Sequence, residues 1–104
     1  MSSEQPLAKL SKDVVVKRLE ALPGWEVNFE EERLVRSWRM RDFATAMQFL
    51  NQVAEIAEQL GHHPDLHLER YRHVRIEIWT HAVGGLTEKD FLLASHINGL
   101  ETAK

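Results

Sequence analysis

The feature that most constrains the fold is one long amphipathic segment with a defined start and a defined end. Apolar residues recur at steps of three and four from Phe43 to Leu60, which predicts a helix with one buried face. Asp42 is a suitable N-terminal cap for it, and Gly61 stands where helices commonly end in a left-handed residue. The rest of the chain is interpreted around this helix and the residues that follow it.

Shorter patterns on both sides of the long helix predict two more helices and four strands. Ser11 can cap a helix that runs through Ala21. Thr87, with Asp90 three residues later, resembles a capping box and predicts the start of the last helix. Alternation of apolar and polar residues predicts strands near residues 25–29, 34–40, 66–71 and 74–80, with a tight connection at residues 72–73 between the last two.

The order helix, two strands, helix, two strands, helix predicts an α+β fold. We expect a four-stranded antiparallel sheet with the helices packed on one face, and Trp25 and Trp38 in the core. A chain of 104 residues is expected to form a single domain, 1–104, with residues 1–9 loosely attached. If the face that bears Tyr71 and Trp79 is uncovered, self-association follows, so we expect a homodimer or a larger assembly.

Composition and charge exclude several kinds of site and partner. The chain has no cysteine, which excludes disulfides, thiol nucleophiles and thiolate zinc sites. No apolar run approaches the ~20 residues of a membrane span, and residues 1–6 lack the apolar region of a signal peptide. We therefore expect a cytoplasmic protein. A net charge of −3 without a basic cluster argues against direct binding of nucleic acid.

Two adjacent histidines follow the long helix, and a third closes the last predicted strand. Pro64 restricts His63 to extended conformations, so His62 and His63 can line two walls of one pocket, near His81 at a rim of the sheet. Histidine both gives and takes protons near neutral pH, which favours proton-transfer chemistry. Glu58 lies in the last helical turn, where the helix dipole disfavours a carboxylate, and a histidine is its expected partner.

Two other interpretations of the histidines remain open at this point. A surface loop can carry two histidines without any function. A metal site is the other rival, because imidazole and carboxylate are metal ligands. However, Pro64 breaks any helical face shared by His63 and His67, and no recognised metal spacing is present, so we expect no metal. His73 and His96 are expected to be structural or exposed.

A larger set of residues around the histidines carries a family resemblance. The set comprises Glu58, His62-His63-Pro64-Asp65, Tyr71, Val74, Thr80-His81, Gly84-Gly85-Leu86-Thr87 and Asp90. In this combination the chain resembles the pterin-4a-carbinolamine dehydratase family. Gly24-Trp25 and the helix start at Asp42-Phe43 also match, whereas Arg72 departs from the asparagine that many members have after the tyrosine.

The resemblance implies an enzyme, a 4a-hydroxytetrahydrobiopterin dehydratase of the hydro-lyase class. Such an enzyme dehydrates 4a-hydroxytetrahydropterin, the 4a-carbinolamine, to quinonoid dihydropterin and water in pterin cofactor recycling. The resemblance implies no metal and no organic cofactor, because the pterin is the substrate, and it implies dimers or tetramers. It places the catalytic residues at His62, His63 and His81, with Glu58, Asp65 and Trp25 near them.

General acid and base catalysis suits this reaction, because the hydroxyl leaves as water only when protonated and N5 must lose its proton. The hypothesis is that His62 and His81 exchange protons with the leaving oxygen while His63 holds the pterin. Asp65 is expected to bind the pterin or brace the loop, and Trp25 to form a wall. The alternatives are a noncatalytic dimerisation or coactivator-type binding module, or a dehydratase of another pterin such as a molybdopterin-related compound.

Overall fold

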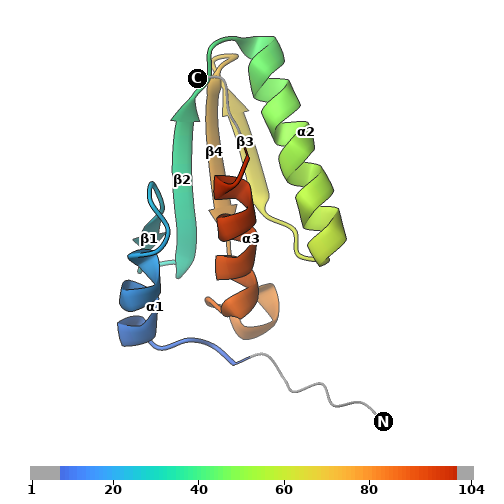
Figure 1. The fold of residues 1–104 in the computed structure, drawn as a ribbon. Helices are drawn as coiled ribbons and strands as arrows, with labels where there is room; N and C mark the ends of the chain where they lie inside the picture. The colour runs from blue at the N-terminus through green and yellow to red at the C-terminus, as the bar shows by residue number, and fades with distance from the viewer. Residues whose placement is uncertain (1–7, 101–104) are drawn as a thin grey trace.

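The computed structural model describes residues 8–100, and the predicted order of helices and strands is confirmed there (Figure 1). The prediction of a loosely attached N-terminus falls mostly outside the described residues. Lys9, which lies inside them, forms an ion pair of 2.9 Å with Glu32. The elements are α1 (Lys12–Leu19), β1 (Glu26–Asn28), β2 (Arg33–Arg39), α2 (Phe43–Leu60), β3 (Asp65–Glu69), β4 (His73–Ile78), the 3₁₀ turn η1 (His81–Val83) and α3 (Glu88–Asn98).

The four strands form one antiparallel sheet in the order β1-β2-β4-β3, as the α+β prediction requires. Helices α2 and α3 lie against the same face of this sheet, and α1 lies beside β1 (Figure 1). Alternate strand residues bury their side chains under the helices, because successive side chains of a strand point to opposite faces. The most buried apolar side chains of this core include Leu34, Met40, Val53, Val74, Ile76, Ile78, Leu93 and Ile97.

Helix α2 begins and ends where its local signals predict. The Asp42 side chain accepts a hydrogen bond of 2.8 Å from the Thr45 backbone N–H, which satisfies one of the free donors of the first turn. Gly61 ends the helix with φ of 66°. The predicted buried face is only partly correct, because Phe43 and Met47 are exposed. The buried residues of α2 are Thr45, Ala46, Phe49, Val53 and Ala57. Within residues 8–100, no helix is both long and apolar enough to cross a bilayer.

The connection between β3 and β4 differs from the prediction. We predicted a strand through Tyr71 and a turn at residues 72–73, but Arg70 and Tyr71 make the turn, with φ of 46° and 56°. The alternating pattern continues past the strand end and does not reveal a turn that lacks glycine. Arg72 then connects this turn to the residue that follows β2: its Nε donates to the Met40 carbonyl oxygen at 2.7 Å, and its own carbonyl accepts from Met40 N–H.

Trp25 and Trp38 pack in the core, as predicted, with their rings edge to face at 5.9 Å. Arg36 shares their face of the sheet, and its guanidinium lies over the Trp38 ring at 4.7 Å. The Asn98 side-chain oxygen accepts hydrogen bonds from Trp25 Nε1 at 2.8 Å and from Arg36 Nη1 at 2.5 Å. One amide at the end of α3 therefore holds the buried indole and the partly buried cation together.

Gly24 is expected to be sensitive to any added side chain. Its φ is +88°, and a Cβ would lie 2.6 Å from the Arg36 guanidinium, which Asn98 holds in place. Gly24→Ala should lower the free energy of unfolding in urea by roughly 2–3 kcal/mol, from left-handed strain plus overpacking. Gly61→Ala is the matched control, because its φ is +66° with open space around it, and it should cost about 1 kcal/mol. Equal losses would contradict the clash.

Candidate active site

The end of α2 turns the two adjacent histidines in different directions. With Gly61 in the left-handed conformation, His62 N–H donates to the Ala57 carbonyl oxygen at 3.1 Å, as in a Schellman-type helix end. The His62 side chain then lies against α3 and is only 11% exposed, whereas His63 is 66% exposed. The local sequence therefore places one imidazole at the protein interior and one at the surface.

His62 is held by the buried carboxylate of Asp90. The distance from His62 Nε2 to Asp90 Oδ1 is 2.6 Å, and the Asp90 side chain is fully buried. A carboxylate only accepts hydrogen bonds, so Nε2 must carry the proton that is shared with it. Nδ1 of a neutral His62 ring is then the atom left to accept a proton.

The other oxygen of Asp90 is also saturated with donors. Oδ2 accepts from the Thr87 backbone N–H at 2.8 Å and from the Thr80 hydroxyl at 2.7 Å. The first of these bonds belongs to the capping box of α3, as predicted. One carboxylate thus caps α3, joins it to the end of β4 and orients the imidazole that follows α2.

His63 has a carboxylate partner of its own at the surface. Its Nε2 lies 2.6 Å from Oε2 of Glu58, one turn back in α2. The expectation that Glu58 contacts a histidine of the pair is met by His63 rather than by His62. Both side chains are well exposed, so water weakens this pairing relative to that of His62 and Asp90.

His81 reaches the same place from the end of β4, one residue into the 3₁₀ turn η1. Its ring stacks on Trp79, with centroids 3.8 Å apart and planes 25° apart. The three predicted catalytic histidines line one open pocket, together with Gly61, Trp79, Thr80, Ala82 and Lys89. Its volume is about 320 Å³, near the lower end of the about 300–1,000 Å³ typical of small-molecule sites.

Asp65 and Trp25 lie outside the residues that line this pocket. Asp65 contacts it through Trp79, whose Nε1 donates to Asp65 Oδ2 at 3.4 Å. Trp25 is 5% exposed and is bonded to Asn98 near the C-terminal end of α3, while Asp90 lies in the first turn of that helix. Contact of either residue with a pterin stays a prediction. Within residues 8–100, no cluster of three or more potential metal ligands is present.

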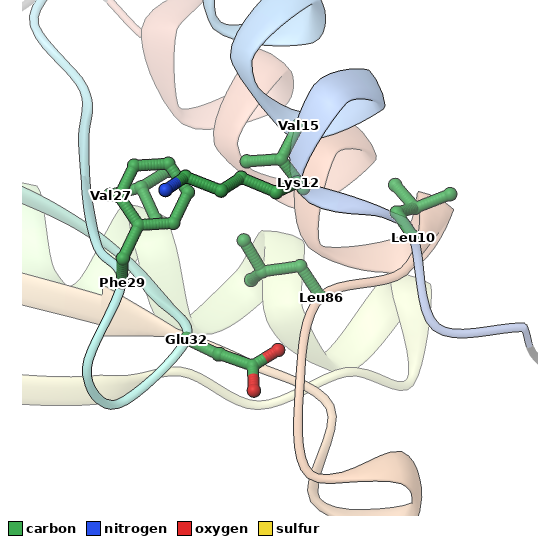
Figure 2. Close-up of a pocket in the computed structure, with 7 residues that line it drawn as sticks. All are labelled: Leu10, Lys12, Val15, Val27, Phe29, Glu32 and Leu86. Atoms are coloured by element: carbon green, nitrogen blue, oxygen red, sulfur yellow. The ribbon is translucent and has the colours of Figure 1, made fainter.

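A second hollow lies between α1 and the β1–β2 turn, and its two ionisable lining residues are Lys12 and Glu32. Figure 2 shows mainly apolar side chains around it, with Lys12 extended toward Phe29. The Lys12 ammonium lies over the Phe29 ring at 4.9 Å, and the Glu32 carboxylate is paired with Lys9. The charged groups there are already engaged, so the histidine pocket is the candidate active site.

Asp90 and Trp79, which contact His62 and His81, were not assigned to the site from the sequence. Asp90 was interpreted through its capping box, which explains one of its oxygens but not the oxygen that holds His62. Trp79 was placed correctly on the far face of the sheet, without a link to His81. Trp79 and His81 are two positions apart, which was the available signal that their rings could meet. Whether the rings stack depends on the turn that follows β4.

Comparison with known proteins assigns the chain to a family. The pterin 4 alpha carbinolamine dehydratase family matches residues 8–100. The chain belongs to this family. Its members most similar in sequence include pterin-4-alpha-carbinolamine dehydratase 2, mitochondrial, of Arabidopsis thaliana, which is 51% identical over 85 residues. The match covers 80% of the chain but 46% of the Arabidopsis protein, so the chain spans about half of that relative.

Other dehydratase relatives match over nearly their whole length. A protein of Acidobacterium capsulatum, provisionally named a pterin-4-alpha-carbinolamine dehydratase, is 46% identical over 90% of this chain and 99% of its own. A crystal structure described as a transcriptional coactivator/pterin dehydratase from Brucella melitensis is 35% identical, with a TM-score of 0.82 over 88% of this chain and 97% of that one. The dehydratase fold is therefore confirmed.

A more distant structure shares the fold alone. It is a pterin dehydratase-like protein described as a RuBisCO assembly factor in the alpha-carboxysome. It is 20% identical, with a TM-score of 0.63 over 78% of this chain and 93% of that one. Proteins with this dehydratase fold are thus described with different functions.

Proposed function

We propose that this protein dehydrates a 4a-hydroxytetrahydropterin by histidine general acid and base catalysis, as a 4a-hydroxytetrahydrobiopterin dehydratase in pterin recycling. The C4a–O bond breaks and the oxygen leaves as water after taking a proton from one imidazolium. N5 gives its proton to a neutral imidazole, and a C4a=N5 double bond forms. The protons balance, and the reaction calls for neither a metal nor an organic cofactor.

The observation that carries this proposal is the convergence of three imidazoles from two separate loops on one pocket. His62 has its proton placed by Asp90, so its free nitrogen can exchange a proton with the substrate. His81 faces the same pocket without a carboxylate partner among the described residues. We assign the acid and base roles to these two rings, in either order, and we assign pterin holding to His63.

The direct test follows the loss of freshly generated 4a-hydroxytetrahydrobiopterin with and without the protein. Each positioned acid or base typically contributes ~10²–10⁴-fold, so dehydration should run far above the buffer background. A folded protein that leaves the background rate unchanged would contradict the proposal. That result would favour the noncatalytic binding module instead.

The alternative of a binding module has one supporting observation. Helix α2 exposes Phe43 and Met47 one turn apart, with exposed fractions of 53% and 40%. Exposed apolar side chains on one helix face suit a protein partner or a second copy of the chain. We also propose a homodimer or homotetramer, which light scattering on the purified protein would test.

Lys89, which lines the histidine pocket, bears on which pterin side chain the pocket accepts. A positive charge there is the observation that supports the alternative substrate, a pterin with an anionic substituent such as a molybdopterin-related compound. Kinetics with a neutral and a phosphorylated pterin would separate the two. A cytoplasmic location stays a prediction, and the name of the Arabidopsis relative places that protein in mitochondria.

A further inference from the structure

His81 differs from the other two histidines of the pocket in what orients its ring. His62 and His63 are each bonded to a carboxylate at 2.6 Å. The ring of His81 has no hydrogen-bond partner within residues 8–100, and its side chain is exposed. Its defined contact is the stack on Trp79 at 3.8 Å. An exposed imidazole without other restraint would sample several rotamers.

Trp79 is itself held in place by two charged residues. The Arg33 guanidinium lies over its indole ring at 4.6 Å, a cation–π contact, and Nε1 donates to Asp65. Arg33 and Trp79 are brought together by the sheet, because Leu34 of β2 pairs with Ile78 of β4 directly beside them. The indole therefore has less freedom than a surface tryptophan.

Arg33 is anchored in turn by Glu77 on the same face of the sheet. Its Nη1 donates to Glu77 Oε1 at 2.7 Å, and Glu77 Oε2 accepts from Arg75 at 3.1 Å. Burial alone would raise the pKa of Glu77, but the hydrogen bond from Arg33 and the nearby positive charges outweigh it and lower that pKa. The same hydrogen bond raises the pKa of Arg33. Both groups therefore stay charged at neutral pH.

We propose that Trp79, clamped by Arg33, is the positioning residue that fixes the His81 imidazole for proton transfer. This inference rests on the proposed dehydratase function and adds a residue that orients one of the two proton-transfer groups. Trp79 acts by holding the His81 ring and not by contacting the pterin. Loss of the indole should lower kcat, because His81 spends less time in the reactive orientation, and should leave KM nearly unchanged.

The test compares Trp79→Leu with Trp79→Phe, which keeps an aromatic ring for the stack. Trp79→Leu should lower kcat by about tenfold, which is the rate factor that corresponds to losing one aromatic pair of ordinary strength. Trp79→Phe should retain most of the wild-type rate. Arg33→Met should lower kcat by about threefold through the same route. Phe29→Leu, an exposed aromatic in the β1–β2 turn, is the matched control and should leave both constants unchanged.

A second measurement does not need turnover. The ring-proton NMR signals of His81, assigned by comparison with His81→Asn, should be shifted upfield by the indole in the wild type and should lose that shift in Trp79→Leu. A wild-type kcat in Trp79→Leu, or unchanged His81 signals, would overturn the proposal. A rise in KM at constant kcat would also overturn it, since Trp79 would then contact the pterin. If the wild type does not turn over, the proposed function fails, and the NMR result still decides the stack.

Discussion

Replacing His62 or His81 by alanine is expected to lower kcat for dehydration by about 100-fold or more in each case. Each substitution removes one of the two groups proposed to move a proton at the reacting atoms, and water is a poorer and unpositioned substitute. The two variants should differ in stability, however. His81 is exposed, whereas His62→Ala leaves Asp90 Oδ1 buried without its partner, which should cost about 1–3 kcal/mol of unfolding free energy.

The rate measurement therefore needs folded protein for both variants. His62→Gln places an amide N–H near the position of His62 Nε2, so it keeps a donor toward Asp90 and serves where the alanine variant is too unstable, with the same expected loss of kcat. His96→Ala, an exposed position in α3 away from the pocket, is the control and should retain the wild-type rate. Near-wild-type rates in both His62→Ala and His81→Ala would end the assignment of these rings to catalysis.

Asp90→Asn is expected to damage both stability and turnover. If the new amide oxygen faces Thr87 N–H and the Thr80 hydroxyl, its NH₂ group faces His62 Nε2 and forces that nitrogen to accept. The wrong tautomer then presents a proton to the pocket where a free nitrogen is needed, which should lower kcat by about 100-fold. The weakened cap and the imperfect buried bonds should cost about 2–4 kcal/mol in urea unfolding.

Glu88→Gln is the matched control for Asp90→Asn. It makes the same acid-to-amide change in the same first turn of α3, at an exposed side chain paired with Arg18. It should change the unfolding free energy by less than about 1 kcal/mol and should leave kcat at its wild-type value. If Asp90→Asn behaves like this control, with the His62 tautomer unchanged by NMR, the coupling of Asp90 to His62 is wrong.

The parts of the fold that were predicted correctly are those with local signals. Asp42 and Gly61 mark the two ends of α2 correctly, because the hydrogen bonds of a helix end involve only neighbouring residues. The capping box of α3 is local in the same sense. The turn at Arg70 and Tyr71 was missed because two non-glycine residues adopt left-handed conformations there, which residue type does not signal.

The sequence predicted that His62, His63 and His81 lie together, but it did not predict the contacts that hold them. The three histidines follow from their placement at element ends and from the family resemblance. The partner of His62 does not, since it depends on how the start of α3 packs against the end of α2, a contact between residues 28 positions apart. The stack of His81 on Trp79 likewise depends on the 3₁₀ turn after β4. Tertiary packing decides both contacts.

The proposed function requires His62, His63 and His81 to form one pterin pocket, and ligand titration by NMR tests this requirement most directly. The probe is dihydrobiopterin, which lacks the 4a hydroxyl and cannot be dehydrated. The imidazole signals of these three histidines should move together with one binding constant, while those of His73 and His96 stay in place as internal controls. Binding that moves the signals of His73 or His96 and leaves those of the three pocket histidines unchanged would contradict the proposed pterin pocket.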